Sequence, residues 1–325
     1  MIQEIADSFY RIEIPLPKNP LRSLNSYVIK SRDRHLIIDT GFDLPECFEA
    51  MKEGLTRLDV RLEDADFFIT HLHSDHAGLV TRLITDTSRV YFNRTDAEFL
   101  TNLDVEKELN SFIQMSGLSG EVVDAMIKVR SRYRYDISAW IGRVIFVKEG
   151  DTVQIGAYSF RCIVTPGHTM GHTCLYEPER KILISGDHVL YDITPNITCW
   201  TDNENRLKQY IASLDRVYNM DVELVLPGHR SVFTDFQGRI KELKRHHEER
   251  ASDVASILEE GALSVAQVAA KMKWDIKCES WDSFPLAQKW FATGEAMAHL
   301  RYLEDDGRVT RKNSNGRRLF GLAGR

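Results

Sequence analysis

The sequence predicts a layered α/β fold, in which sheets lie between helices. Short apolar runs that end in turn residues indicate strands, and they alternate with longer segments in which apolar residues recur at helical spacing. This alternation is typical of folds in which helices cover the faces of a sheet. The chain has 325 residues, of which 43% are hydrophobic, so it is long enough for one large domain and a small second one.

Seven apolar runs are predicted to be strands. In chain order they lie at residues 26–31, 35–41, 65–71, 89–93, 158–167, 181–188 and 222–229. Helical spacing is clear in residues 204–218, where Leu207 and Ile211 share one face. Residues 95–145 contain helical stretches and no strand signal, so we interpret them as an insertion into the fold.

Composition and charge argue against several classes of protein. The 48 acidic residues outnumber the 42 basic ones, so bulk charge does not predict a nucleic-acid partner. No apolar run approaches the roughly 20 residues of a membrane span, and the first residues lack a signal-peptide pattern. We therefore expect a cytoplasmic protein with no membrane partner. The five cysteines form no C-x-x-C pair, which argues against a disulfide framework or a thiolate metal site.

Side chains that can bind a metal follow several of the predicted strands. They are His71, His73, Asp75, His76, His168, Asp187 and His229. Imidazole and carboxylate ligands without thiolate suit zinc, iron or manganese, and a carboxylate can bridge two such ions. Alone, any one of these residues would more often be an ordinary core, surface or turn residue. Their convergence at strand ends instead predicts a metal centre, where His71 and His73 can grip one ion while Asp75 and His76 face a second.

Five motifs resemble those of the metallo-β-lactamase superfamily, in its glyoxalase II-like branch of hydrolases. They are IIDTG at 37–41, THLHSDH at 70–76, TPGHTMGH at 165–172, SGDH at 185–188 and LPGH at 226–229. The resemblance runs from about residue 1 to 235. It implies an αββα sandwich with a dinuclear metal site at one edge.

The resemblance also implies a role for each site residue. One metal ion would take His71, His73 and His168, and the other would take Asp75, His76 and His229, with Asp187 bridging the two. Asp39 and His172 would support the ligands without binding metal. The implied cofactors are two divalent transition-metal ions per chain, with zinc favoured over iron or manganese.

The reaction that follows is hydrolysis of an ester, thioester or related small molecule. A hydroxide that bridges the two metals would attack the substrate, and Asp75 would act as the catalytic residue that orients the nucleophile and passes a proton to the leaving group. Two alternatives remain open. Persulfide dioxygenases share much of the motif and use one iron, and endoribonucleases of the superfamily cleave RNA.

The residues after 235 predict a second, smaller part of the chain. Residues 1–235 are predicted to form the metallo-β-lactamase domain, 236–262 a linking helix and 263–325 a winged-helix-like domain. In the linking helix, His246 and His247 are expected to lie on the solvated face. The last region shows two helices, the first capped by Ser264, and then a hairpin signal at Asn315 and Gly316. It resembles the small C-terminal domain of superfamily proteins related to a mitochondrial endoribonuclease.

Two further hypotheses concern partners. Basic residues cluster on the predicted wing, at Arg308, Arg311, Lys312, Arg317 and Arg318. They could contact a phosphate backbone, but a wing is also ordinarily basic and solvated, so a small-molecule substrate is favoured over nucleic acid. A homodimer is left open.

The insertion offers side chains for an apolar lining of the site, with arginines for an anionic group. These are Phe112, Met115, Met126, Tyr133 or Tyr135, Arg130, Arg132 and Arg134. Helix packing explains the same residues equally well.

Overall fold

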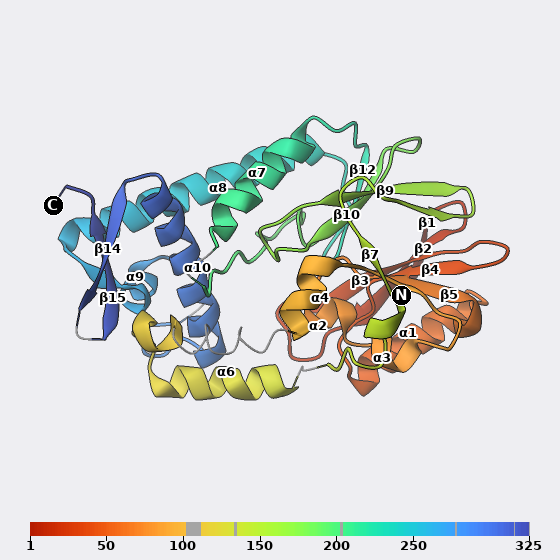
Figure 1. The fold of residues 1–325 in the computed structure, drawn as a ribbon, viewed down its shortest axis with the longest axis horizontal. Helices are drawn as coiled ribbons and strands as arrows, with labels where there is room; N and C mark the ends of the chain where they lie inside the picture. The colour runs from red at the N-terminus through yellow and green to blue at the C-terminus, as the bar shows by residue number, and fades with distance from the viewer. Residues whose placement is uncertain (102–111, 133–134, 202–203, 277, 315, 325) are drawn as a thin grey trace. The chain divides into compact units, whose positions relative to one another are not determined.

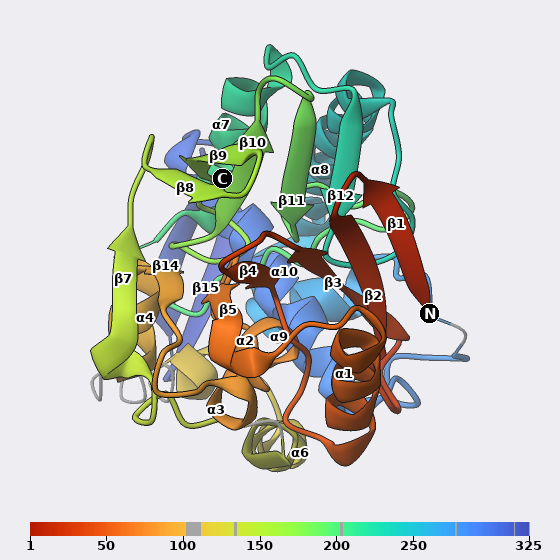
Figure 2. The same cartoon turned by 90° about the vertical axis from the view of Figure 1, so that its right-hand side faces the viewer.

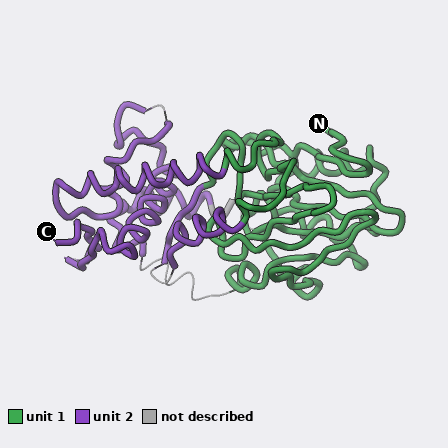
Figure 3. Tube along the Cα trace, turned by 90° about the horizontal axis from the view of Figure 1, so that it is seen from above, with its two compact units in different colours: residues 1–101, 133–195, 217–239 green, residues 102–132, 196–216, 240–325 purple. Residues whose placement is uncertain are grey.

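The computed structural model describes residues 1–101, 112–132, 135–201, 204–276, 278–314 and 316–324. The chain divides into two compact units, which Figure 3 colours separately. Unit 1 contains residues 1–101, 133–195 and 217–239, and unit 2 contains residues 102–132, 196–216 and 240–325. The domain boundaries at residues 235 and 262 stay a prediction.

Unit 1 contains a seven-stranded sheet whose strands are ordered as in the sequence (Figure 2). Its strands are β1 (Ile2–Ala6), β2 (Phe9–Pro15), β3 (Ser23–Ile29), β4 (His35–Ile38), β5 (Ala65–Phe68), β6 (Val90–Asn93) and β7 (Val144–Val147). The pairs from β1 to β4 are antiparallel, and the pairs from β4 to β7 are parallel. Parallel strands end at the same edge, so the loops after β4, β5 and β6 meet there.

The second sheet of unit 1 has five strands in the order β12-β11-β10-β9-β8. Its strands are β8 (Thr152–Ile155), β9 (Tyr158–Val164), β10 (Thr173–Glu177), β11 (Ile182–Gly186) and β12 (Leu224–Pro227). β11 and β12 are parallel, and the remaining pairs are antiparallel. The two sheets share one apolar core, in which Phe9 and Tyr27 of the first sheet pack with Phe160 and Leu175 of the second.

The helices of unit 1 pack on the first sheet. They are α1 (Pro45–Arg57), α2 (Ser74–Ala77), α3 (Val80–Leu83) and α4 (Arg94–Thr101), with short 3₁₀ turns at Leu62–Asp64 and Ile141–Arg143. Helix α1 starts with proline at its first turn and buries Met51 and Leu55 against the sheet. A side chain at Gly54 would lie 2.7 Å from Ile12 of β2, so glycine allows the helix to approach the strand closely.

Unit 2 is built mainly from helices and ends in a small sheet (Figure 1). Its elements are α6 (Gly120–Arg132), α7 (Arg206–Tyr218), α8 (Phe236–Ile257), a 3₁₀ turn (Leu258–Glu260), β13 (Leu263–Ser264), α9 (Val265–Lys271), α10 (Leu286–Asp305), β14 (Val309–Ser314) and β15 (Arg317–Leu322). The first residues of α8 and the last of α7 belong to unit 1. The predicted cap is confirmed, because the Ser264 hydroxyl accepts the backbone N–H of Gln267 and the Gln267 side chain accepts the backbone N–H of Ser264.

The predicted C-terminal hairpin is confirmed as β14 and β15, which pair antiparallel from Val309 with Leu322 to Ser314 with Arg317. Asn315 lies outside the described residues. The order of helix, helix and hairpin is therefore present, while the winged-helix assignment stays a prediction. Among the described residues, no helix combines the length and the apolarity that crossing a membrane requires.

The expectation that His246 and His247 are both solvated is wrong for His247, which is 2% exposed. Its position explains this. On α8, buried residues recur at spacings of three and four, and His247 is one of them: Ile240, Leu243, His247, Ala251 and Val254. The exposed charged neighbours Arg245, Glu248 and Glu249 belong to the other face of the helix.

Candidate metal centre

Segments that follow four strands of unit 1 bring seven imidazole and carboxylate side chains together. The segment after β5 carries four of them, and the loops after β9, β11 and β12 carry one each. In three groups the ligand atoms lie within 4.8 Å of one another: His71 with His73 and His168, His71 with His76 and Asp187, and Asp75 with His76 and His229. The structure thus brings together all seven residues that the sequence predicts as ligands.

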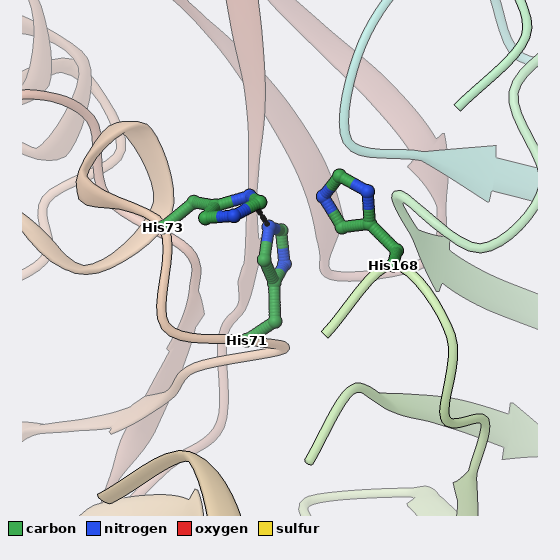
Figure 4. A group of neighbouring side chains, drawn as sticks. All are labelled: His71, His73 and His168. Carbon is green, nitrogen blue, oxygen red and sulfur yellow. Dashed lines mark hydrogen bonds between the residues drawn. The ribbon is translucent and has the colours of Figure 1, made fainter. Parts of the chain in front are cut away.

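The first group consists of His71, His73 and His168, whose rings point toward one another (Figure 4). Nε2 of His71 lies 3.0 Å from Nδ1 of His73. The ring centroids of His73 and His168 are 4.5 Å apart. Three imidazoles that converge in this way can hold one metal ion.

The second group consists of Asp75, His76 and His229. Nε2 of His229 lies 3.3 Å from Nε2 of His76 and 3.5 Å from Oδ2 of Asp75. Asp187 reaches both groups, because its Oδ2 is 3.5 Å from Nε2 of His168 and 3.6 Å from Nε2 of His229. A carboxylate at this point can contact an ion held by either group.

Asp39, directly after β4, fixes the segment that carries the first four predicted ligands. Its Oδ2 lies 2.7 Å from Nδ1 of His76, and its two oxygens accept the N–H and O–H of Thr70 at 2.9 and 2.8 Å. The contact with Nδ1 leaves Nε2 of His76 facing the site. Asp39 adopts φ 57°, a left-handed conformation that is costly for a residue with a side chain. The turn that holds this carboxylate is therefore strained.

His172 lies beside the centre and uses both ring nitrogens. Nδ1 is 2.7 Å from Oγ1 of Thr165, and Nε2 accepts the backbone N–H of Asp187 at 3.1 Å. This pair of contacts assigns the proton of the neutral ring to Nδ1. His172 therefore holds the backbone from which the Asp187 carboxylate projects.

His229 is held by the first sheet, although it follows a strand of the second. Its Nδ1–H donates to the carbonyl of Ser23 at 2.8 Å. Nearby on β3, the backbone N–H of Asn25 donates to the carbonyl of Gly228 at 2.7 Å. A side chain on Gly228 would lie 2.7 Å from Oδ1 of Asp187, so only glycine fits between the last ligand and the central carboxylate.

Burial and neighbouring charges set the protonation states. Burial lowers the pKa of His71 well below its ordinary value and that of His73 to about 3, and adjacent imidazoles act in the same direction. Burial alone would raise the pKa of Asp75, but the neighbouring His229 outweighs it and the pKa falls to about 2. For His76, burial lowers the pKa, yet the carboxylates around it raise it well above its usual range. Neutral imidazoles and ionised carboxylates are the forms that bind metal.

These residues fit a divalent transition-metal ion. Their donors are imidazole nitrogens and carboxylate oxygens, the ligands that zinc, iron and manganese share. Oδ1 of Asp187 is buried, and no hydrogen-bond donor reaches it from the described residues; Nε2 of His76 is 3.6 Å away. A buried carboxylate oxygen without a donor is destabilising, and a bound cation relieves this.

Asp96 of α4 is not among the site residues that the sequence predicts. It is wholly buried and accepts hydrogen bonds from Leu72, Thr169 and Gly171 in the loops that carry the predicted ligands. No local signal marks it, because an aspartate in the first turn of a helix is common for reasons of helix electrostatics alone.

The side chains predicted to line the site have packing roles. In unit 2, the Phe112 ring packs edge to face on Trp200, and Met126 lies in an apolar cluster with Trp290. In unit 1, the Tyr135 hydroxyl donates to a backbone carbonyl in the first ligand segment at 2.5 Å. Tyr133 and Arg134 lie outside the described residues, as do the side chains of Arg130 and Arg132.

The predicted basic cluster is partly engaged within unit 2. Arg318 is buried and donates to the sulfur of Met115 at 3.7 Å. Arg311 forms a 3.0 Å ion pair with Glu304. These contacts reduce the basic surface of the hairpin, and nucleic-acid binding stays an untested hypothesis.

Comparison with known families shows which superfamily this chain belongs to. The family model described as metallo-beta-lactamase superfamily matches residues 20–229, which is more than half of the chain. The chain belongs to the metallo-beta-lactamase superfamily. A second model, metallo-beta-lactamase-like C-terminal domain, matches residues 282–321. The superfamily prediction is therefore confirmed, and with it the prediction of a superfamily hydrolase.

Relatives include proteins named as thioesterases. Acyl-coenzyme A thioesterase MBLAC2 of Homo sapiens is 28% identical over 220 residues, which cover 64% of this chain and 74% of that protein. Atrochrysone carboxyl ACP thioesterase nsrC of Aspergillus novofumigatus is 27% identical over 243 residues, 74% of this chain and 59% of that protein. The chain likewise spans 62% of the lactamase-like protein aptB of Emericella nidulans.

A solved structure extends the likeness to nearly the whole chain. The metallo-beta-lactamase family protein of Thermus thermophilus superposes with a TM-score of 0.82 at 25% identity, covering 98% of this chain and 100% of that one. The predicted metallo-β-lactamase fold class is confirmed.

Proposed function

We propose that this superfamily hydrolase is a dinuclear metal-dependent thioesterase, which cleaves an acyl thioester with water to give a carboxylic acid and a thiol. The observation that carries the proposal is the position of Asp187, within 3.6 Å of a histidine in each of two separate ligand groups. Two groups that share a carboxylate suit a pair of ions. The thioesterase names of two relatives support the choice of substrate.

The proposal assigns each residue a role. His71, His73 and His168 would hold one ion, Asp75, His76 and His229 the other, and Asp187 would contact both. When bound, the ions supply Lewis acidity, which polarises the thioester carbonyl and makes water acidic enough to lose a proton near neutral pH. Zinc fits these ligands best, and iron and manganese fit them too.

Asp75 would orient the attacking water and move its proton. A carboxylate with a pKa of about 2 is ionised at pH 7 and accepts a hydrogen bond from that water. The same low pKa makes it a poor final site for the proton, so it would pass the proton to the departing thiolate. The bond that forms joins the water oxygen to the acyl carbon, and the bond that breaks is the carbon–sulfur bond.

Asp39 and His172 would keep the ligands in place without binding an ion. Asp39 orients His76 through Nδ1, and His172 holds the backbone of Asp187. Such outer hydrogen bonds fix the ring orientation and raise the basicity of ligands, and their loss typically weakens metal affinity by about 10- to 100-fold.

The test measures turnover of a panel of substrates by one preparation of the protein whose metal content has been determined. Acyl-coenzyme A thioesters of increasing chain length, a lactone, a phosphodiester, a short RNA and, with oxygen present, a small-molecule persulfide are incubated with chelated protein and with protein reloaded with zinc, iron or manganese. We expect about two ions per chain and thioester turnover that disappears with the chelator and returns with the metal. Turnover of RNA or a persulfide in preference to every thioester would replace this proposal with one of the two alternatives.

A further inference from the structure

Asp96 joins the two loops that carry the first group of histidines. It lies in the first turn of α4, and it is 0% exposed. Oδ2 accepts the backbone N–H of Leu72 at 2.9 Å and the hydroxyl of Thr169 at 2.7 Å. Oδ1 accepts the backbone N–H of Gly171 at 2.7 Å. One carboxylate thus receives hydrogen bonds from residues that are far apart in the sequence.

Two of these donors are adjacent to predicted ligands along the chain. Leu72 lies between His71 and His73, and Thr169 directly follows His168. The two loops belong to different sheets, since the first follows β5 and the second follows β9. The carboxylate of Asp96 therefore ties the ligand loop of one sheet to the ligand loop of the other.

The contact at Gly171 shows how closely the second loop approaches. A Cβ at this position would lie 2.7 Å from Oδ1, from the carboxyl carbon and from the backbone nitrogen of Asp96. No side chain fits there, so the glycine in TPGHTMGH is needed for this approach. A second link supports the first, because Thr173 donates its backbone N–H to the carbonyl of Thr70 at 2.8 Å.

We propose that Asp96 is a positioning residue of the metal centre, which sets the distance between the His71 and His73 pair and His168. The inference rests on the proposed function in that it requires the centre to bind an ion. Asp96 does not need to touch the ion. By fixing both loops, it holds the three imidazoles at one spacing before the ion binds. The two loops therefore lose less conformational entropy when the ion binds.

Asp66 of β5 provides the matched control. It is also buried in the first sheet, at 2% exposure, and its carboxylate also accepts several hydrogen bonds. Its donors are the side chain of Arg34 and both the side chain and the backbone N–H of Arg89. These donors lie outside the ligand loops, so Asp66 has a structural role without a link to the centre.

The experiment compares the wild type, Asp96→Asn and Asp66→Asn by two measurements. The first is zinc affinity, determined by competition with a coloured chelator, and the second is the visible absorption of the cobalt(II)-loaded protein. The amide of Asp96→Asn presents donors where the loops also present donors, so we expect zinc binding to weaken by at least about tenfold and the cobalt bands to shift. Asp66→Asn should lower the melting temperature while leaving affinity and spectrum at wild-type values. Wild-type affinity and spectrum in Asp96→Asn would overturn the inference.

Thr169 keeps the test decisive if Asp96→Asn does not fold. Thr169→Val removes one of these hydrogen bonds and should weaken zinc binding less than Asp96→Asn, while Thr169→Ser retains the hydroxyl and should bind as wild type does. Equal zinc affinity of Thr169→Val and Thr169→Ser would count against a positioning role for Asp96. A wild-type chain that binds no zinc or cobalt would instead refute the proposed function, so the two failures are distinguishable.

Discussion

Two sets of buried histidines, one in each unit, differ in the charges around them. In unit 1, Nε2 of His71 lies 3.0 Å from Nδ1 of His73. In unit 2, Nδ1 of His247 lies 3.3 Å from Nε2 of His299, and both rings are buried. By ring spacing alone, the two pairs look alike.

The charged side chains around the two sets of histidines differ. Carboxylates stand among the histidines of unit 1, as the short distances from Asp187 to His168 and His229 show. The pair in unit 2 instead faces Arg250, and burial together with neighbouring positive charge lowers the pKa of His247 well below its usual value. Close imidazoles are therefore not sufficient evidence of a metal site. Buried carboxylates that require a cation make the difference.

The largest expected effect comes from removing the central carboxylate. Asp187→Ala should lose most of its metal, and thioester turnover should fall by at least about a thousandfold, because Lewis acidity is worth several kcal/mol and each 1.4 kcal/mol or so is tenfold. Metal analysis and turnover are measured on one preparation. The control is Glu295→Gln, which removes the carboxylate that pairs with Arg250 in unit 2 at 2.8 Å. Normal metal content in Asp187→Ala would contradict the shared-carboxylate assignment.

Asp75→Asn should have the next largest effect. The amide keeps the shape and one oxygen but loses the charge, so turnover should fall by about 10²- to 10⁴-fold through the lost proton transfer. At least the ion held by His71, His73 and His168 should remain. Metal content measured beside kcat separates the two roles of this residue. If both ions and near-normal turnover persist, Asp75 is neither a required ligand nor a proton carrier.

His172→Ala should act more weakly, because it removes a support and not a ligand. The backbone N–H of Asp187 loses its acceptor, and we expect zinc affinity to fall by about tenfold. Competition with a chelator measures this affinity. A loss of metal as complete as in Asp187→Ala would show that His172 is itself a ligand.

The smallest expected effect on the centre is that of His299→Gln, which should leave metal content and turnover unchanged. Its effect is on stability at low pH. Burial, with Arg250 nearby, lowers the pKa of His299 to about 3, whereas in the unfolded chain it is about 6.5. Between these values the unfolded chain binds a proton that the folded chain does not, so the free energy of unfolding falls by about 1.4 kcal/mol per pH unit on acidification.

His299→Gln should therefore lose less stability than the wild type between pH 6.5 and about 4, with both proteins metal-loaded. Urea unfolding followed by tryptophan fluorescence reports mainly on unit 2, where Trp200, Trp274, Trp281 and Trp290 lie. An unchanged pH dependence would mean that the His247 and His299 pair is accessible to protons in the folded chain.

The seven predicted ligands and most long strands follow from local sequence, because a run of apolar residues before HLHSDH, TPGH, SGD and PGH marks a buried strand and the turn after it. Two of the strands that were not predicted lack such a signal. β1 carries a polar residue on each face, and β7 is a four-residue edge strand whose first two residues lie in the region interpreted as an insertion. Neither strand shows a clear alternation of polar and apolar residues.

Asp96 and His247 could not be predicted for a different reason. The partners of Asp96 are 24 to 75 residues away in the sequence, so its role depends on how the two sheets come together. His247 is surrounded by charged residues in the sequence, and only its register relative to Leu243 and Val254 places it on the buried face of α8. The position of a residue in the period of a helix is more informative here than the polarity of its neighbours.

The hydrogen bond from His229 to Ser23 bears on how the protein matures during synthesis. More than 150 residues separate His71 from His229, and at about 5–20 residues per second the ribosome needs roughly ten to thirty seconds to make them. Throughout this interval the nascent chain carries His71, His73 and His76 without their last partner. Because β12 must pair with β11 and dock on Ser23 and Asn25 of β3 before His229 is in place, the full ligand set assembles only once the second sheet is complete. On the proposed assignment, an ion captured earlier would be held by part of the set and could still exchange with the surrounding pool, so the metal would be selected late, after β12 has been made.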